Sequence, residues 1–253
     1  MVQDLLTQCR WPSLSEPYDG ALREAVTFIL TRFAVHGLIV SGSIISGNAS
    51  PSSDLDIMVL HAQPQRQRLQ RFFQGVPAEI FVNPPQAIRT YFAEERTDGR
   101  PSTAHMWANG FVVLNGDPLV DTLRQEAAAW LQKSPDPTPL ALTMKRYFNA
   151  DAFENALDLV DHDPAMALLL MHTAIWQMVN DRFLMANRPI PRHKAILAKL
   201  KELDPPAGAA VEHFLLEPAL PAKWELGKAA AHLLNGAIGF FEWETEPETI
   251  TAT

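Results

Sequence analysis

The sequence predicts an α/β (α+β) N-terminal domain with a short mixed sheet, followed by an all-α helical bundle. In the first half of the chain, short apolar runs alternate with segments that have helical spacing, which is typical of strands between helices. Residues 134–139 place three prolines among small polar residues and form a stiff, extended break. Beyond this break every segment has helical spacing. We therefore expect two domains, covering residues 1–133 and 134–253.

The elements of the N-terminal domain follow from hydrophobic spacing and from turn residues. Apolar residues at helical spacing predict a first long helix over 19–33. Period-two or continuous apolar runs predict strands at 38–40, 57–60, 79–82 and 111–114. Helices are expected at 65–73, 84–95 and 104–109, and a further one that runs to about residue 133. The Pro84-Pro85 pair ends one strand and starts the helix that follows.

The second domain is expected to be entirely helical. The predicted helices cover 140–160, 164–185, 192–203, 207–215 and 224–242. Asp163 is a suitable N-cap for the second of these, and Pro164 occupies its first helical position. The polar segment 244–253 is expected to fray.

Composition describes a globular protein that can bury a core. Of the 253 residues, 47% are hydrophobic and 20% are charged. No apolar run reaches the about 20 residues that a membrane-spanning helix needs. The first residues lack the basic start and apolar stretch of a secretory signal, and the single cysteine, Cys9, excludes an internal disulfide and a cysteine-rich zinc site. We therefore expect a cytoplasmic protein.

The acidic balance restricts the partners. A net charge of −8 argues against binding to long nucleic acids, which depends on Lys and Arg side chains that neutralise phosphates. It is compatible with a local site for one nucleotide, and it suits a cationic small-molecule acceptor. No membrane partner is expected. The sequence leaves the oligomeric state open, a homodimer included.

The segment 38–60 carries most of the functional information. A short apolar run leads into Gly42-Ser43, a polar loop follows, and Asp54-Leu55-Asp56 opens a second apolar run. Residues i and i+2 of a strand share a face, so Asp54 and Asp56 point one way while Leu55 points into the core. A Gly-Ser turn lets backbone N–H groups approach an anion. Two adjacent carboxylates repel each other unless a hard cation such as Mg²⁺ neutralises them.

These residues resemble the signature of the nucleotidyltransferase superfamily, whose fold is like that of polymerase β. The signature consists of Gly-Ser, a loop, Asp-x-Asp, and a third carboxylate on a later strand, which here is Glu79 within 78–82. Domain 1–133 is thus expected to be the nucleotidyltransferase domain. Domain 134–253 resembles the C-terminal helical domain of aminoglycoside nucleotidyltransferase-like proteins.

The resemblance implies Mg²⁺-dependent transfer of a nucleoside monophosphate, AMP from ATP or its equivalent from another nucleoside triphosphate, to a hydroxyl of a small molecule. An aminoglycoside is the leading acceptor. Asp54, Asp56 and Glu79 would hold two Mg²⁺ ions, with Glu79 acting as a metal ligand or as the base. Gly42 and Ser43 would bind the phosphates.

Basic side chains from another part of the chain must also balance the negative charge of the phosphates. Relatives often carry a basic residue just after Gly-Ser, where this chain has Ile44-Ile45. In related enzymes a lysine of the helical domain reaches the triphosphate. Lys194 is our preferred candidate for that role, and the alternatives are Lys145, Arg146 and Arg192.

Further polar and aromatic residues allow two interpretations each. The acidic helix face formed by Asp151, Glu154 and Asp158 either binds ammonium groups of an acceptor or is simply solvated. Asp117 is either a base or a turn residue. Trp107 either stacks on a substrate ring or packs between the domains, and His172 and Trp176 are expected in the core.

Other functions remain alternatives to transfer onto a small molecule. The same chemistry could modify a protein side chain or a nucleic-acid end. A non-catalytic nucleotide-binding module, such as a regulatory or toxin–antitoxin partner, belongs to a different class. The intact set of Asp54, Asp56 and Glu79 argues against a non-catalytic module.

Overall fold

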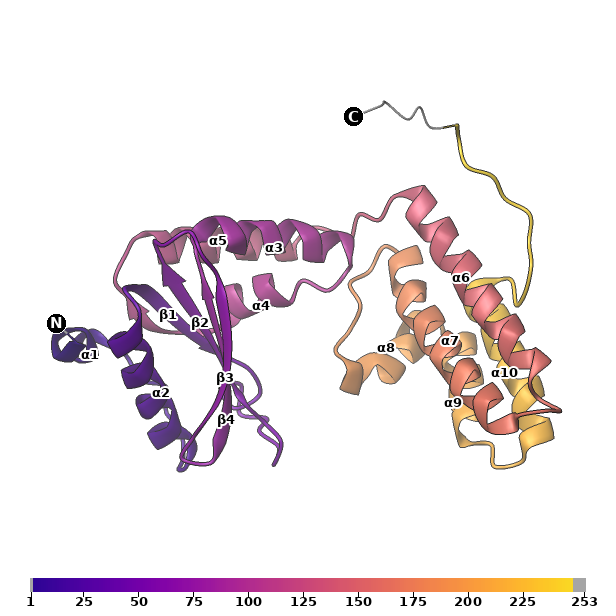
Figure 1. Cartoon of the computed structure of the whole chain (residues 1–253), viewed down its shortest axis with the longest axis horizontal. Helices are drawn as coiled ribbons and strands as arrows, with labels where there is room; N and C mark the ends of the chain where they lie inside the picture. The colour runs from indigo at the N-terminus through magenta and orange to yellow at the C-terminus, as the bar shows by residue number, and fades with distance from the viewer. Residues whose placement is uncertain (1, 248–253) are drawn as a thin grey trace. The chain divides into compact units, whose positions relative to one another are not determined.

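A computed structural model describes residues 2–247, which form two compact units with a boundary between Lys133 and Ser134. The first unit contains a mixed sheet with flanking helices, and the second contains helices (Figure 1). The predicted fold class is therefore confirmed. Among the described residues, no helix is both long and apolar enough to cross a membrane. The predicted fraying of 244–253 falls largely on residues 248–253, outside the described part.

Ten elements, counted within residues 2–247, make up the first unit. In chain order they are α1 (Val2–Gln8), α2 (Tyr18–Arg32), β1 (Val35–Ser41), β2 (Leu55–His61), β3 (Gln67–Phe73), β4 (Val76–Asn83), α3 (Pro85–Thr97), α4 (Ser102–Asn109), β5 (Phe111–Asn115) and α5 (Leu119–Leu131). The strands lie in the order β3-β4-β2-β1-β5. β2 and β4 run parallel, and the other neighbouring pairs are antiparallel.

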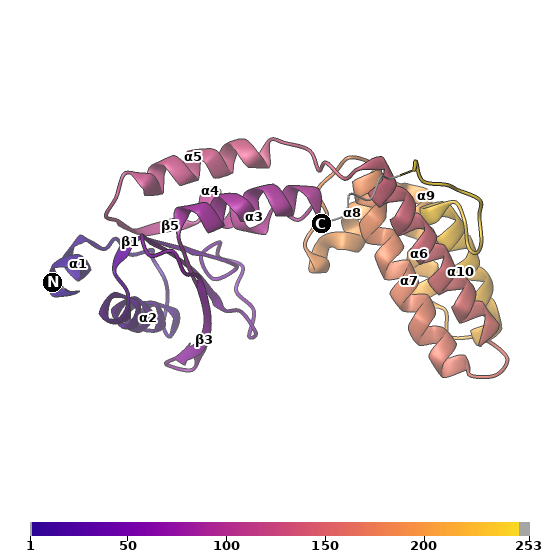
Figure 2. The ribbon, with the colours of Figure 1, turned by 45° about the horizontal axis from the view of Figure 1, so that its top comes forward.

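Helices cover the two faces of this sheet. α2 lies on one face, and α3, α4 and α5 lie on the other (Figure 2). The side chains of β2 alternate accordingly, because successive residues of a strand point to opposite faces. Ile57 packs in the core under α2, whereas Met58 packs in the core under α3, α4 and α5. Asp56, two residues before Met58, therefore lies on the same face as α3, α4 and α5.

The helix predicted over 65–73 is wrong, because this segment forms the edge strand β3. β3 pairs antiparallel with β4 through a tight turn at Gln74 and Gly75, whose φ values are 48° and 79°. Positive φ at both central residues is the geometry that favours a two-residue hairpin. Most β3 side chains are exposed, so the strand carries no apolar alternation that would identify it.

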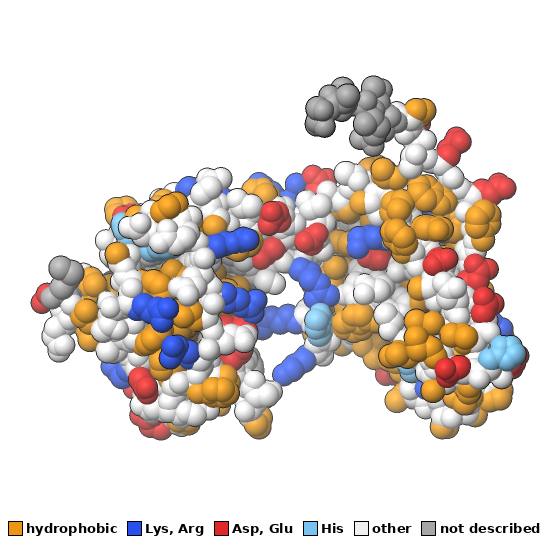
Figure 3. Space-filling model, in the orientation of Figure 1, with side chains coloured by type: hydrophobic (Ala, Val, Ile, Leu, Met, Phe, Trp, Pro, Cys, Tyr) orange, Lys and Arg blue, Asp and Glu red, His pale blue; other side chains and the backbone are white. Residues whose placement is uncertain are grey.

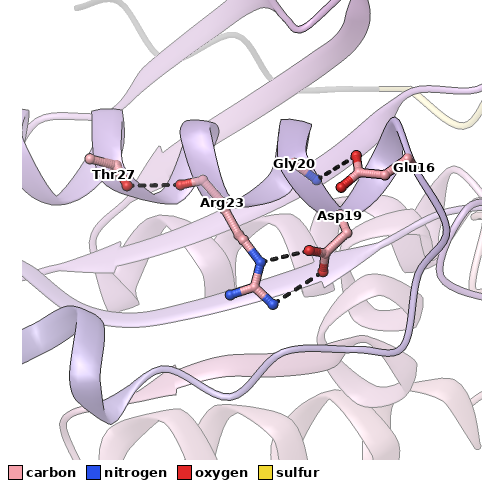
Figure 4. A network of polar contacts seen from close by, with 5 residues as sticks. All are labelled: Glu16, Asp19, Gly20, Arg23 and Thr27. Carbon is pink, nitrogen blue, oxygen red and sulfur yellow. Dashed lines mark hydrogen bonds and ion pairs between the residues drawn. The ribbon is translucent and has the colours of Figure 1, made fainter.

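The start of α2 shows how local polar contacts fix a helix that lacks a capping side chain. Pro17 occupies the N-cap, and the carboxylate of Glu16 accepts a hydrogen bond from the Gly20 N–H at 3.3 Å (Figure 4). Arg23 donates to Asp19 at 2.6 Å, one helical turn away. Negative side chains in the first turn also favour the positive end of the helix dipole.

Trp107 lies inside the first unit, which corrects both sequence interpretations. Its side chain is 1% exposed and packs beneath the sheet with Ile39 and Phe92. It is therefore a core residue of the first unit. A buried aromatic on α4 serves the core because few side chains fill as much volume.

The second unit consists of α6 (Pro139–Asp158), α7 (Pro164–Met185), the 3₁₀ turn η1 (His193–Ala195), α8 (Ile196–Leu203), α9 (Pro205–Leu216) and α10 (Leu220–Asn235), as far as the described residues extend. Asp163 caps α7 as its sequence context suggests, since its carboxylate accepts from the Met166 N–H at 3.0 Å. The helix predicted over 224–242 begins earlier and ends earlier. It ends because Gly236 adopts a left-handed φ of 75°.

The core of the second unit is formed by α6, α7, α8, α9 and α10, with Phe153, Met171 and Phe214 among its buried side chains. His172 is half-buried against the Phe214 ring, 4.8 Å between centroids, and this burial lowers its pKa, with a smaller contribution from Lys223. Trp176 was expected in the core, but it is 38% exposed. Its ring meets the His193 ring edge-on instead.

Hydrophobic side chains also remain on the surface of the second unit. They gather on the face that Figure 3 shows. Exposed large hydrophobic side chains of this unit include Leu169, Leu216 and Phe240.

Candidate active site

Three carboxylates meet where β2 begins. Asp54, Asp56 and Glu79 each offer one oxygen atom, and these atoms lie within 4.8 Å of one another. The parallel pairing of β2 with β4 places Asp56 directly beside Glu79. Asp54 precedes Asp56 by two residues and adds the third carboxylate. The structure thus brings together the three acidic residues that the sequence singled out.

The chemistry of this cluster fits a hard divalent cation. Like charges at such a separation repel, so three carboxylates are costly without compensation. Mg²⁺ prefers oxygen ligands and is commonly bound through carboxylates. Asp54, Asp56 and Glu79 are half-buried, which leaves part of the cluster open to a ligand.

Gly42 is required by both its conformation and its surroundings. It directly follows β1, whose last residue Ser41 lies opposite Asp56. Its φ of 98° is one that residues with a Cβ rarely adopt, and an added Cβ would lie 2.8 Å from Asp56 Oδ2. The glycine therefore leaves room for the Asp56 carboxylate to lie against the backbone.

The loop after Gly42 is held by its own hydrogen bonds. The Gly42 carbonyl accepts from the Ser46 N–H at 3.2 Å, and the Ser43 carbonyl accepts from the Asn48 N–H at 2.8 Å. The Ser43 and Ser53 hydroxyls lie 2.6 Å apart, and Ser53 Oγ accepts from the Ser50 N–H at 2.8 Å. Ser43 thus ties the start of the loop to the residue before Asp54. A hydroxyl in one such bond can still make a second, so its predicted phosphate contact stays a prediction.

Glu79 has partners that the sequence did not reveal. Arg68 Nη2 donates to Glu79 Oε2 at 2.7 Å, and Gln70 Nε2 donates to Glu79 Oε1. Both donors belong to β3, the segment that was wrongly predicted as a helix. The sequence signal for a hairpin at this point is the Gln74-Gly75 pair, which forms the turn between β3 and β4.

Asp117 has a structural role at the opposite end of the sheet. Its carboxylate accepts from the Leu119 N–H at the start of α5, at 2.8 Å, and lies 3.0 Å from His36 Nδ1. The Leu119 N–H, followed by His36, holds the pKa of Asp117 below its usual value. Ser41, which pairs with Asp56, is five residues beyond His36 on β1, or roughly 16 Å along the strand. The alternative of Asp117 as the base is therefore a poor one.

The basic candidates of the second unit have different surroundings. Lys145 Nζ is 3.0 Å from the buried Asp181, and Arg146 Nε donates to the Asn235 carbonyl at 3.2 Å. Both are thus engaged inside their own unit. Arg192 and Lys194 are exposed at η1, and the predicted phosphate contact of Lys194 stays a prediction.

Comparison with known proteins agrees with this geometry. Residues 22–106 match the nucleotidyltransferase domain family, and this range contains Gly42, Ser43 and all three carboxylates. The match confirms the superfamily resemblance. The fold is similar to that of a nucleotidyltransferase-like protein from Exiguobacterium sibiricum, with a TM-score of 0.53 and 13% identity over 85% of this chain and 74% of that chain. Among curated proteins, none matches the sequence.

Proposed function

Because residues 22–106 match the nucleotidyltransferase domain family, we propose that this chain is a Mg²⁺-dependent enzyme that transfers AMP from ATP to a hydroxyl of a small molecule. The observation that carries the proposal is the cluster of Asp54, Asp56 and Glu79 beside the Gly42-Ser43 turn. In the reaction, the acceptor oxygen forms a bond to the α-phosphorus. The bond from that phosphorus to the oxygen that bridges to the β-phosphate breaks, and pyrophosphate leaves.

Each residue of the cluster has a role in this reaction. Asp54 and Asp56 would hold the metal, and Glu79 would complete its ligand set or take the proton of the acceptor hydroxyl. When bound, Mg²⁺ neutralises phosphate charge and clamps the reacting oxygens. Gly42 leaves room for the Asp56 carboxylate beside the backbone, and the backbone at Ser43 would offer an N–H group to a phosphate oxygen.

The acceptor we propose is a cationic molecule of the aminoglycoside kind. Asp151, Glu154 and Asp158 are exposed along α6, and Glu154 lines an open hollow of the second unit with His232 and Phe240. Carboxylates attract ammonium groups, and the net charge of −8 favours the approach of a cation. Lys194 would supply charge to the triphosphate.

Nucleotide binding is the first test. Calorimetric titration of ATP, and then of the other nucleoside triphosphates, with Mg²⁺ would compare wild type with Asp54→Ala/Asp56→Ala. A Glu24→Ala/Asp161→Ala control removes the same charge at exposed positions. We expect Mg²⁺-dependent binding by wild type and by the control, and its loss in the double variant of the cluster.

The outcome decides between the transferase and its main rival. Wild-type binding would justify a screen of acceptors with radiolabelled nucleotide, in which label should move to an aminoglycoside-like compound. Failure of wild type to bind any triphosphate, with and without candidate acceptors, would overturn the proposal and favour a non-catalytic module.

A further inference from the structure

Edge strand β3 presents a row of polar side chains to the acidic cluster. Arg68 and Gln70 are two residues apart and therefore share a face of the strand. In the pairing of β3 with β4, Gln70 lies opposite Glu79 and Arg68 lies opposite Phe81. The Arg68 guanidinium also lies over the Phe81 ring, 4.9 Å from its centroid. Arg68 thus contacts both an aromatic ring and the third carboxylate.

Gln70 and Arg68 have different effects on the Glu79 carboxylate. Gln70 Nε2 donates to one carboxylate oxygen and brings no charge, so it orients the side chain. Arg68 Nη2 donates to the other oxygen at 2.7 Å and brings a positive charge to a cluster of three carboxylates. A charge-assisted bond of this kind is stronger than a neutral one. Arg68 therefore offsets part of the repulsion between the carboxylates in the absence of metal.

The same charge must oppose a metal ion that binds there. The Arg68 side chain is 61% exposed and that of Glu79 is 20% exposed, so the arginine approaches the carboxylate from the solvent side. A divalent cation bound to Glu79 would lie close to this guanidinium, and two positive charges at short range repel. A flexible, exposed arginine can also move away at small cost, because surface ion pairs are weak.

Building on the proposed function, we propose that Arg68 and Gln70 are positioning residues for Glu79. Gln70 holds the carboxylate in the cluster. Arg68 is a resident counter-ion that a divalent cation must outcompete, so that it lowers the affinity of the nucleotide-free site for metal. Deleting the charge of Arg68 should therefore tighten metal binding, whereas deleting the amide of Gln70 should weaken it.

Screening by water and salt limits how much the metal affinity changes when the charge of Arg68 is removed. Because Arg68 is largely exposed, water and salt weaken its repulsion of a divalent cation, and we expect R68Q to bind metal roughly three- to tenfold more tightly than wild type. R68K keeps the charge and should stay close to wild type. Q70A leaves one oxygen of Glu79 without its donor and should bind metal more weakly.

The test is a titration of the full-length, nucleotide-free protein with Mn²⁺, followed by electron paramagnetic resonance of the free ion. Arg71 provides a matched control, because it is the next arginine along β3 but lies on the opposite face, 4.7 Å from the Phe28 ring centroid. R71Q removes the same charge and should leave the affinity unchanged. If R68Q does not fold, Arg68→Met repeats the test with a side chain that still covers Phe81.

The outcomes separate this inference from the proposed function. If wild type binds Mn²⁺ and R68Q binds it with the same affinity or less tightly, the counter-ion role is overturned while the metal site stands. An equal gain in R68Q and R71Q also overturns it, since that result reports only the net charge. If wild type does not bind Mn²⁺, the metal site of the proposed function fails and this inference fails with it.

Discussion

A methyl group added at Gly42 should weaken metal binding by more than its effect on stability explains. Gly42→Ala introduces a Cβ at a residue whose φ is 98°, and that Cβ would lie 2.8 Å from Asp56 Oδ2. The chain offers a matched control in Gly47, which has a φ of 75° and no atom within 4 Å of an added Cβ. Gly47→Ala therefore carries backbone strain without the contact at Asp56.

The two effects have different magnitudes. A residue with a Cβ in the left-handed region costs roughly 1–2 kcal/mol, so we expect both variants to lose a similar amount of unfolding free energy. Only Gly42→Ala must also displace the Asp56 carboxylate, since the contact is shorter than van der Waals separation. Mg²⁺ requires near-ideal octahedral geometry, so displacement of the Asp56 carboxylate should weaken its binding. Changes that reorient a ligand typically cost about 10- to 100-fold in metal affinity.

Two assays on the same samples test this reasoning. Urea unfolding in EDTA should give a similar loss of stability for Gly42→Ala and Gly47→Ala. Titration with Mn²⁺ should show weak binding in Gly42→Ala and wild-type binding in Gly47→Ala. Wild-type affinity in Gly42→Ala would refute the role of the glycine, and an equal loss of affinity in Gly47→Ala would show that the loop as a whole, rather than the contact with Asp56, matters.

Three further predictions concern charged residues. Asp54→Asn should abolish Mn²⁺ binding yet raise the unfolding free energy in EDTA by roughly 0.5 kcal/mol, because it relieves like-charge repulsion; a loss of stability in urea unfolding would contradict this. Asp117→Asn keeps an acceptor for the Leu119 N–H but removes the charge, and the folded-state pKa of Asp117 is lowered. Wild type should therefore be the more stable protein above about pH 4, with the difference fading as the pH falls through the lowered pKa, and a pH-independent difference would contradict it. Asp181→Leu removes the 2.8 Å acceptor of the buried Asn149 amide and the ion-pair partner of Lys145, and it should cost about 1–3 kcal/mol in urea unfolding; Asn149→Leu in the same chain should restore the part that comes from the unpaired amide.

The acidic cluster could be predicted because period-two alternation is a strong local signal. Asp56 and Glu79 alternate with apolar residues, which assigns them to strands, and Asp54 lies two residues before Asp56 and so is expected on the same face. Local periodicity does not show which strands are neighbours in the sheet. The parallel pairing that places Asp56 beside Glu79 depends on contacts between segments far apart in the chain, and only the resemblance to a known signature supplied it.

The end of α10 shows a second limit of pattern reading. The apolar residues Ala237, Ile238 and Phe240 continue the pattern of the helix, so the sequence predicts that it runs on to 242. In the structure Gly236 takes a φ of 75° and donates its N–H to the His232 carbonyl, and the helix stops. A glycine at this point is the usual C-terminal signal. In the prediction, the hydrophobic spacing of the residues after Gly236 outweighed this signal. In the structure that spacing serves the packing of the segment that follows the helix.

Strand β3 was missed because hydrophobic patterns report burial, and an edge strand near an active site has little to bury. Its polar residues carry the information instead. In a helix, Arg68 and Gln70 would point about 200° apart, so they could not both reach one carboxylate. In a strand they share a face, and both donate to Glu79. Period two in the polar residues, together with the Gln74-Gly75 turn, thus predicts a strand whose exposed face serves the site. The same periodicity that locates Asp54 and Asp56 also locates the side chains that restrain Glu79, once it is applied to charge as well as to hydrophobicity.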